Sequence, residues 1–558
     1  MTLLAAALGL STLLSAPAAS SSPGLVSAEE QRAAAAITPE LLKAHVRFLA
    51  SDLLEGRGPA SRGDGLAREY VATELEALGL QPAAPGGGWT QKVPLVGITA
   101  SVPGTMTFAA GAKKLEIENK KDFIAFSGVQ KPEARIDDAE LVFVGYGIVA
   151  PEYRWDDYKN VDVRGKVIVI MNNDPEDDPK LFAGKTRLWY GRWDYKYEMA
   201  GKSGAVGAII IHTTHSAGYS WQVVQTSWAG EKFELPYEGE PRVQIKMWAT
   251  EEASRKIAAL GGKDLDRLRA AAQRRDFKPV PLGVRLSFAL QNTIVQKESG
   301  NVIGKLPGSD AKLKDEAVLY TAHHDHFGIQ AGVKAGPDII YNGAVDNASG
   351  VSALLAVARA YSALPKAPRR TIYFASVTAE EQGLLGSEYL ARHPPVPVGR
   401  IAADINIDGA NIFGRTRDLT MIGLGKSSLD AIVVALAGTQ GRVVKPDQFP
   451  DRGHFYRSDQ FNLARVGVPA AYFDTGTDFV GRPPGWGKEQ IEKWEATHYH
   501  QPSDEYRDDW DLSGAVEDAR LDFLLGVKVA NADAMPTWNK GDEFEAARKK
   551  ALADVGPR

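Results

Sequence analysis

Three histidines within four positions mark the stretch of sequence with the clearest capacity for chemistry. His323, His324 and His326, with Asp325 among them, directly follow the apolar stretch 317–322, which predicts a buried strand. In open α/β sheets, ligands bind at the carboxyl ends of strands. An imidazole in this position can hold a metal ion while the aspartate orients it through its second ring nitrogen. A solvated, histidine-rich turn explains the same residues equally well.

Carboxylates follow at two further positions of the same kind. Asp346 precedes a predicted helix over 348–364, where it is either the N-cap or a carboxylate whose two oxygens bridge two cations. Glu380 and Glu381 follow the predicted strand 371–377. Adjacent carboxylates repel each other unless a cation or a proton relieves them. A solvated glutamate pair at the start of a helix is the alternative.

Asp408 and His500 complete a possible ligand set. Asp408 ends the predicted strand 401–407, and His500 lies in a loop near the end of the chain. An ordinary turn is the alternative for Asp408. Because the chain has no cysteine, any metal must be held by His, Asp and Glu. Two imidazoles and several carboxylates suit a pair of Zn²⁺ ions.

The elements that must position these residues change in character along the chain. Residues 38–53 and 65–78 predict amphipathic helices, and short β-like runs separated by turns follow from about residue 92. From residue 301 onward, apolar strands alternate with helices. This alternation predicts an α/β fold with a mixed, mostly parallel sheet flanked by helices. A β-rich module over about 115–295 would be inserted before it, since 558 residues are too many for one core.

The first residues predict an export signal. Residues 3–14 are almost wholly apolar, and Ala16-Pro17-Ala18 has the small-x-small pattern of a cleavage site. The apolar run is too short to span a bilayer, so no membrane anchor is expected. A signal peptide normally begins with Lys or Arg, which Met1-Thr2 does not supply. If the segment is an export signal, the protein is periplasmic or extracellular. The alternative is that the segment is an Ala- and Ser-rich tail without a targeting role.

Composition excludes few classes of protein but argues against two kinds of partner. The chain is 44% hydrophobic and 24% charged, as is ordinary for globular proteins. Its net charge is −5, from 65 Lys and Arg against 70 Asp and Glu. This balance provides no attraction for nucleic acid or for an anionic membrane. The oligomeric state is not predicted.

The order of these motifs resembles peptidase family M28, the zinc peptidases related to bacterial leucyl aminopeptidases. The matching elements are His323-His324-Asp325, Asp346-Asn347-Ala348-Ser349-Gly350, Glu380-Glu381, Asn406-Ile407-Asp408 and Tyr499-His500-Gln501-Pro502-Ser503-Asp504. The resemblance covers about residues 38–110 and 297–530, and five ordered motifs make it specific. Many relatives have two consecutive aspartates in the second element, whereas the first of these positions is Val345 here. The metal ligand of the family aligns with the second, Asp346.

The resemblance implies a site for two Zn²⁺ ions per chain. One zinc would be held by His323, Asp408 and Asp346. The other would be held by Glu381, His500 and Asp346, so that Asp346 bridges the two.

The resemblance also implies catalytic roles for three residues. Glu380 would be the general base that takes a proton from water and passes it to the leaving amine. Asp325 would hold His323 through its second ring nitrogen. Tyr499 would stabilise the oxyanion, with a packed aromatic beside the site as the alternative.

The β-rich insertion is similar to the protease-associated domain of many family members. The similarity rests on residues 158–167, with a Gly-Lys turn before an apolar strand, and on residues 204–208. The expected segments are a signal peptide (1–19), the N-terminal part of the peptidase domain (20–114), the inserted domain (115–295), the catalytic domain (296–535) and a charged C-terminal tail (536–558).

The function implied by the resemblance is an exported zinc exopeptidase that acts on peptides, with an aminopeptidase as the first expectation. A carboxypeptidase or dipeptidase, or a glutaminyl cyclase, is the alternative on the same scaffold. The cyclase chemistry works with one zinc, whereas both zinc sites are complete here. A receptor-like binding protein without catalysis is a further alternative, although such proteins typically lose ligands that this chain retains.

Overall fold

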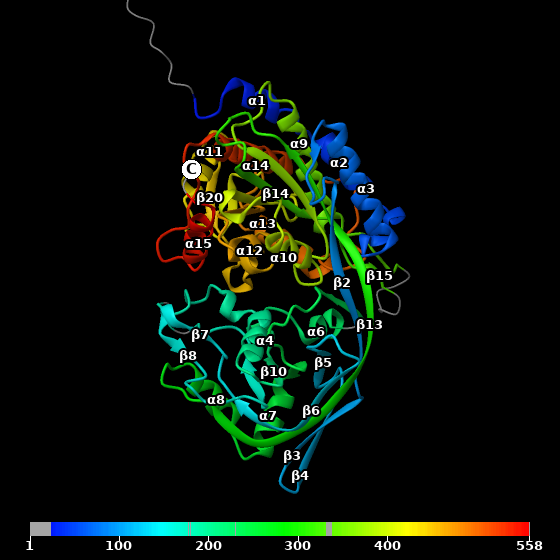
Figure 1. Cartoon of the computed structure of the whole chain (residues 1–558), viewed down its shortest axis with the longest axis vertical. Coiled ribbons are helices and arrows are strands. Elements are labelled where there is room, and N and C mark those ends of the chain that lie inside the picture. The colour runs from blue at the N-terminus through cyan, green and yellow to red at the C-terminus, as the bar shows by residue number, and fades with distance from the viewer. Residues whose placement is uncertain (1–23, 177, 179, 229, 331–337, 557–558) are drawn as a thin grey trace, which may run out of the picture.

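The computed structural model describes residues 24–176, 178, 180–228, 230–330 and 338–556 of the chain (Figure 1). The predicted export signal, residues 1–19, lies outside them. Within the described ranges, no helix is both long enough and apolar enough to cross a membrane.

A mixed, mostly parallel sheet forms the centre of the upper part of the molecule in Figure 1. Strand β14 (Ala317–His323) pairs in parallel with β17 (Thr371–Val377) and with β18 (Ile401–Asn406). Further strands are β21 (Ala470–Asp474), β19 (Asp418–Ile422) and β20 (Val443–Pro446). Of these, β21 is parallel to β18, whereas β19 is antiparallel to β21. The predicted fold class is confirmed.

Helices cover both faces of this sheet because its strands are apolar on both sides. Val318 and Tyr320 of β14 pack on one face, and Leu319 packs on the other. The first face is covered by α1 (Ala28–Ala34), α2 (Pro39–Leu49), α3 (Arg62–Ala77), α9 (Gly350–Ser362), α11 (Leu429–Thr439) and α14 (Ser513–Asn531). The second face is covered by α10 (Leu385–Arg392) and α12 (Gln460–Arg465). Two more helices of the upper part are α13 (Trp486–Thr497) and α15 (Glu545–Val555).

One long strand, β13 (Val280–Leu306), runs through both parts of the molecule and links them (Figure 1). It pairs with β17 of the upper sheet, with β2 (Thr90–Ser101) along its middle and with β6 (Glu133–Phe143) in the lower part. The boundary expected at 295/296 therefore falls inside a continuous strand. The boundary expected at 114/115 falls inside β4 (Lys113–Glu118).

The lower part has hydrophobic cores of its own, built on strands and helices together. Its further strands are β3 (Thr105–Ala110), β5 (Phe123–Ser127), β9 (Val167–Met171), β10 (Gly207–His212), β11 (Glu231–Glu234) and β12 (Ile245–Thr250). Its helices are α4 (Trp193–Lys202), α5 (Thr214–Ala217), α6 (Trp221–Ser227), α7 (Glu251–Leu260) and α8 (Leu265–Ala272). Short pairs complete the fold: β1 (Gln81–Pro82), β7 (Val149–Ala150) with β8 (Trp155–Asp156), and β15 (Gly328–Ile329) with β16 (Ile340–Tyr341).

The two N-terminal helices are shorter or shifted relative to their prediction. The first ends at Leu49, and a tight turn over Asp52–Arg57 follows, in which Glu55 and Gly56 have positive φ. The second begins at Arg62 because the Ser61 hydroxyl accepts a hydrogen bond from the Asp64 backbone N–H and caps it. The turn between them brings Arg57 to the functional site.

Candidate active site

The carboxyl ends of three neighbouring parallel strands bring the predicted residues together. His323 is the last residue of β14, the glutamate pair follows β17, and Asp408 follows β18. Asp346 lies just before α9, in the segment Ala344–Ser349. Because β14 lies between β17 and β18, the ends of all three strands meet at one edge of the sheet.

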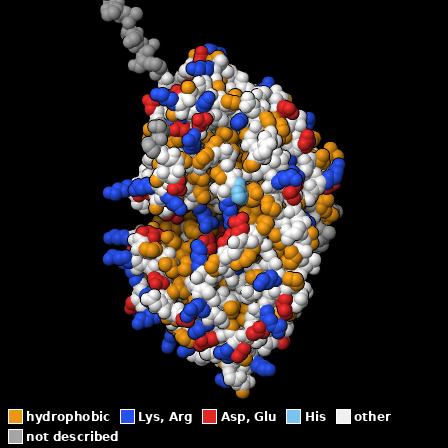
Figure 2. Space-filling model, viewed as in Figure 1, with side chains coloured by type: hydrophobic (Ala, Val, Ile, Leu, Met, Phe, Trp, Pro, Cys, Tyr) orange, Lys and Arg blue, Asp and Glu red, His pale blue; other side chains and the backbone are white. Residues whose placement is uncertain are grey.

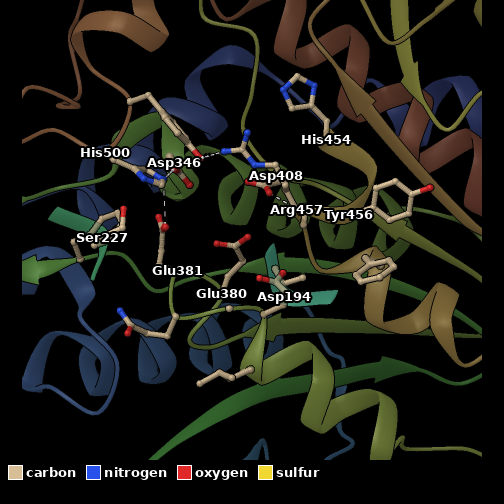
Figure 3. A pocket seen from close by; sticks show the side chains of 18 of the residues that line it. Asp194, Ser227, Asp346, Glu380, Glu381, Asp408, His454, Tyr456, Arg457 and His500 are labelled. Atoms are coloured by element: carbon tan, nitrogen blue, oxygen red, sulfur yellow. Dashed lines mark hydrogen bonds and ion pairs between the residues drawn. The ribbon is translucent and has the colours of Figure 1, made fainter. Parts of the chain in front are cut away.

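Asp346 lies between two imidazoles, with one oxygen directed at each. Its Oδ1 is 3.3 Å from His323 Nε2, and its Oδ2 is 3.2 Å from His500 Nε2. His323 Nε2 is also 3.2 Å from Asp408 Oδ1. His500 Nε2 is 3.3 Å from Glu381 Oε2 (Figure 3). The five residues predicted as metal ligands therefore form two groups that share one carboxylate.

His326 is a member of this cluster to which the sequence analysis assigned no role. Its Nδ1 lies 2.6 Å from Glu381 Oε1, and the side chain is fully buried. His326, Asp346 and Glu381 place their ligand atoms within 4.8 Å of one another, as do His323, Asp346 and Asp408. His326 Nε2 is buried and has no hydrogen-bond partner among the described residues. The third histidine of the His-rich motif was the signal in the sequence.

The charges of this cluster are unbalanced without a cation. Burial, together with the charge of Asp408, raises the pKa of Glu380 well above its ordinary value. Burial and the charge of Asp346 do the same to the pKa of Glu381. Burial also acts to raise the pKa of Asp346, but hydrogen bonds from the two imidazoles outweigh it and hold this pKa well below the usual range. Divalent cations would relieve this repulsion, and the nitrogen and oxygen donors present are those that zinc prefers.

Asp325 holds the glutamate pair in place. Its carboxylate accepts hydrogen bonds from the backbone N–H groups of Glu380 (3.0 Å) and Glu381 (3.4 Å). Its backbone carbonyl lies 3.2 Å from His323 Nδ1, whereas its carboxylate oxygen is 3.7 Å away. Asp325 therefore contacts the second ring nitrogen of His323 most closely through its backbone, and its carboxylate orients the turn that carries Glu380.

Two further motif residues fix the loop of Asp346. The carboxylate of Asp504 accepts hydrogen bonds from the backbone N–H of Val345 (2.9 Å) and of Asp346 (3.1 Å). Asn347 donates to the Ile407 carbonyl (3.1 Å) and accepts from the Gly409 N–H (2.8 Å). The loop that carries Asp346 is thereby tied to the strand end that carries Asp408.

Tyr499 lies beside the cluster, a position that suits both the predicted oxyanion role and the alternative of a packed aromatic. Its ring stacks on that of His500, with 3.7 Å between ring centroids. Its hydroxyl is 3.1 Å from Arg457 Nη2. The sequence assigned no role to Arg457 either. The residues around it do not show that its side chain faces the site.

Arg57 joins the end of α2 to the loops that follow His323 and precede Asp346. Its Nε donates to the His324 carbonyl (2.7 Å), its Nη1 to the carbonyls of Leu49 (2.5 Å) and Asn342 (2.6 Å), and its Nη2 to that of Gly343 (2.9 Å). The side chain is 1% exposed. Burial lowers the pKa of Arg57 to about 10, so the guanidinium remains charged at neutral pH.

Replacing Arg57 with methionine is expected to lower the free energy of unfolding by about 3 kcal/mol or more, because buried backbone carbonyls lose charge-assisted hydrogen bonds. Zinc affinity should also fall, since the loops after His323 and before Asp346 lose their common anchor. Urea unfolding and zinc titration measure the two effects. Arg62→Met is the matched control, because Arg62 is exposed and an exposed ion pair such as that with Glu55 contributes little to stability. Equal stability of the two variants would contradict the anchoring role of Arg57.

The site opens into a large cleft between the upper and lower parts of the molecule. The cleft has a volume of about 2570 Å³ and is lined by residues of both parts, among them Trp193 and Lys232 from below and Tyr499 from above. Figure 2 shows the hollow, with acidic and basic side chains gathered around it. A peptide, rather than a single amino acid, fits a space of this size.

Comparison with known proteins agrees with the geometry of the site. Residues 301–524 match the model of Peptidase family M28. This region of the chain belongs to peptidase family M28. The match includes all five predicted metal ligands and Glu380. The predicted resemblance to this family is confirmed, whereas the similarity of the insertion to a protease-associated domain stays a prediction.

Two relatives align with about a quarter of this chain. Aminopeptidase NAALADL1 of Mus musculus is 33% identical over 136 residues, which are 23% of this chain and 16% of that protein. A probable glutamate carboxypeptidase of Arthroderma benhamiae is 33% identical over 146 residues, 25% of this chain and 18% of that protein. The chain thus spans less than a fifth of the length of each of these two relatives.

A solved structure shares the fold over most of the chain. The aminopeptidase from Aneurinibacillus sp. strain AM-1 superposes with a TM-score of 0.51 at 20% identity, covering 91% of this chain and 97% of that one. The similarity therefore includes the lower part of the molecule as well as the M28 region.

Proposed function

We propose that this chain is an exported, two-zinc aminopeptidase that removes N-terminal residues from peptides. The observation that carries the proposal is the arrangement of two donor groups that share Asp346, with Glu380 next to them. The names of two relatives support hydrolysis of peptides as the class of reaction. The mouse relative is called an aminopeptidase and the fungal relative a probable glutamate carboxypeptidase. The proposal that the protein is exported rests on the predicted export signal, residues 1–19, alone.

His323, Asp408 and one oxygen of Asp346 would hold one zinc. Glu381, His500 and the other oxygen of Asp346 would hold the second. His326 could take part at the second position, because its Nδ1 contacts the remaining oxygen of Glu381. When bound, zinc supplies Lewis acidity, which polarises the scissile carbonyl and makes a nearby water more acidic.

Glu380 would move the protons of the reaction. Its carboxylate reaches to 4.0 Å from His323 Nε2, and Asp325 fixes its backbone. A carboxylate with a raised pKa accepts a proton from water near neutral pH and then gives it to the departing amine. The Tyr499 hydroxyl would donate a hydrogen bond to the carbonyl oxygen as negative charge develops on it.

The test is a metal analysis combined with a substrate panel. Protein loaded with zinc should contain about two zinc ions per chain. It should hydrolyse peptides with a free N-terminus and leave N-blocked peptides intact. A single zinc, or cleavage of blocked peptides only, would overturn the aminopeptidase and favour the cyclase or carboxypeptidase alternatives.

A further inference from the structure

Three basic side chains of the cleft form no ion pair with a carboxylate of the described residues, unlike the others. Most of the cleft's lysines and arginines are paired with carboxylates, namely Arg192, Lys202, Arg242, Lys246, Lys297, Arg392, Arg452 and Arg465. In the described part of the chain, no carboxylate lies within ion-pair distance of Arg457, Lys232 or Lys120. Lys120 is exposed, whereas Arg457 and Lys232 are half-buried.

Arg457 lies directly beside the metal cluster. It follows the short helical turn His454–Tyr456, and the next residue, Ser458, donates a hydrogen bond to Asp408 Oδ2 (2.5 Å). Figure 3 shows Arg457 in the same pocket as Asp346, Asp408 and Glu380. Its hydrogen bond to the Tyr499 hydroxyl engages one of its five N–H groups. The guanidinium therefore has free donors next to the predicted reaction centre.

Lys232 approaches the same cluster from the lower part of the molecule. It lies on β11, whose Phe233 N–H donates to Gln382 Oε1 (3.4 Å), next to the glutamate pair. Phe233 and Leu235 pack against Ala379 and Leu385 and hold β11 against this turn. Burial lowers the pKa of Lys232 to about 8, with the charge of Glu381 acting in the opposite direction. The ammonium is thus both partly desolvated and within the field of Glu381.

A half-buried cation without a counter-charge is unfavourable, and the nearby carboxylates cannot serve once they hold metal. Zinc would engage Asp346, Glu381 and Asp408. Among the described residues, the carboxylates of Glu380 and Glu495 act on Arg457 without forming an ion pair with it, so its guanidinium can still pair directly with an anion from outside the protein. The planar guanidinium fork matches a carboxylate in particular, because two parallel N–H groups meet its two oxygens. The missing partner is therefore an anionic group on the substrate.

We propose that Arg457, with Lys232 on the opposite wall, binds a carboxylate of the peptide near the scissile bond. The preferred substrates would then be short peptides with a free C-terminal carboxylate, or peptides with an acidic side chain next to the cleaved bond. This inference rests on the proposed peptidase function and specifies its substrate class. It also gives the lower part of the molecule a direct role in substrate binding, through Lys232.

Matched peptides test the proposal on zinc-loaded protein. The dipeptide Ala-Leu is compared with its C-terminal amide, and Leu-Glu-Leu amide with Leu-Gln-Leu amide, which separates the two sources of the carboxylate. The charged member of at least one pair should have a kcat/KM higher by about 10- to 100-fold, mainly through KM. Arg457→Gln should remove most of this preference, Lys232→Met should reduce it, and Arg457→Lys should retain part of it.

Arg465→Gln is the control, because Arg465 lines the same cleft but pairs with Glu198. It should leave the preference unchanged. A wild-type protein that cleaves charged and neutral members equally would overturn the proposal and leave the peptidase function standing. So would an Arg457→Gln variant whose kcat falls equally on both members, since Arg457 would then act only through Tyr499.

A binding measurement separates this proposal from the peptidase function. The Glu380→Gln variant, loaded with zinc, is titrated with Ala-Leu and with Ala-Leu amide by calorimetry. Tighter binding of the acid, lost on adding Arg457→Gln, supports the carboxylate site even if no peptide is hydrolysed. Equal affinities for acid and amide would overturn it.

Discussion

Replacing Glu380 with glutamine is expected to lower kcat by about 10³-fold while zinc content stays unchanged, since general acid–base catalysis typically contributes 10²- to 10⁴-fold. Glutamine keeps the shape of the side chain but cannot take a proton from water or give one to the leaving amine. Glu380 belongs to neither of the two groups of candidate ligands that share Asp346, so metal binding should not depend on it.

Steady-state kinetics on an unblocked dipeptide, with zinc content measured on the same sample, checks this expectation. Glu492→Gln is the control, because Glu492 is an exposed glutamate that lines the same cleft. It should keep nearly all activity. A Glu380→Gln variant with near-normal kcat would exclude Glu380 as the base, and one that loses zinc would make it a ligand instead.

Replacing Asp346 with asparagine is expected to abolish the binding of both zinc ions and all activity with it. Each carboxylate oxygen of Asp346 faces a different imidazole, 3.3 Å from His323 and 3.2 Å from His500. Asparagine offers one acceptor oxygen, and its NH₂ group would point at the other metal position. Neither position would keep its shared ligand.

Thermal unfolding provides a readout of this loss that does not depend on activity. A metal that binds only the folded state stabilises it by about 4 kcal/mol at a free concentration 1,000 times Kd, so zinc should raise the Tm of the wild type. Asp346→Asn should show little or no rise. Asp478→Asn is the control, because Asp478 lies in the same part of the chain and pairs with the exposed Arg417. An Asp346→Asn variant with two zinc ions and a normal rise in Tm would contradict the bridging role.

Local sequence determined much of the fold of the M28 region. The apolar runs 317–322, 371–377 and 401–407 became β14, β17 and β18 almost residue for residue, because a strand buried on both faces must be apolar throughout. The N-terminal helices were predicted less well. Their ends depend on a Ser61 cap and on a turn with positive φ, which hydrophobic periodicity does not encode.

The same logic separates what was found of the site from what was missed. The cluster of candidate metal ligands could be predicted because its residues follow strands or form short motifs, and parallel strands bring their carboxyl ends together. Arg57, His326, Arg457 and Lys232 could not be assigned in the same way. Arg57 donates hydrogen bonds to backbone carbonyls some 270 to 290 positions away in the chain, such as those of His324 and Gly343, and a local sequence pattern does not show such contacts.

The sequence by itself therefore determined the fold class and the resemblance to the family. It also predicted five of the six residues whose donor atoms meet in the cluster, all but His326, since each of these results depends on short-range patterns of polarity and spacing. Only the tertiary structure decided which imidazoles meet Glu381, how one arginine joins α2 to loops of the site, and which basic side chains remain without an ion-pair partner in the cleft. Those features arise when segments far apart in sequence pack together. Their energies depend on distance and desolvation, which no local pattern records.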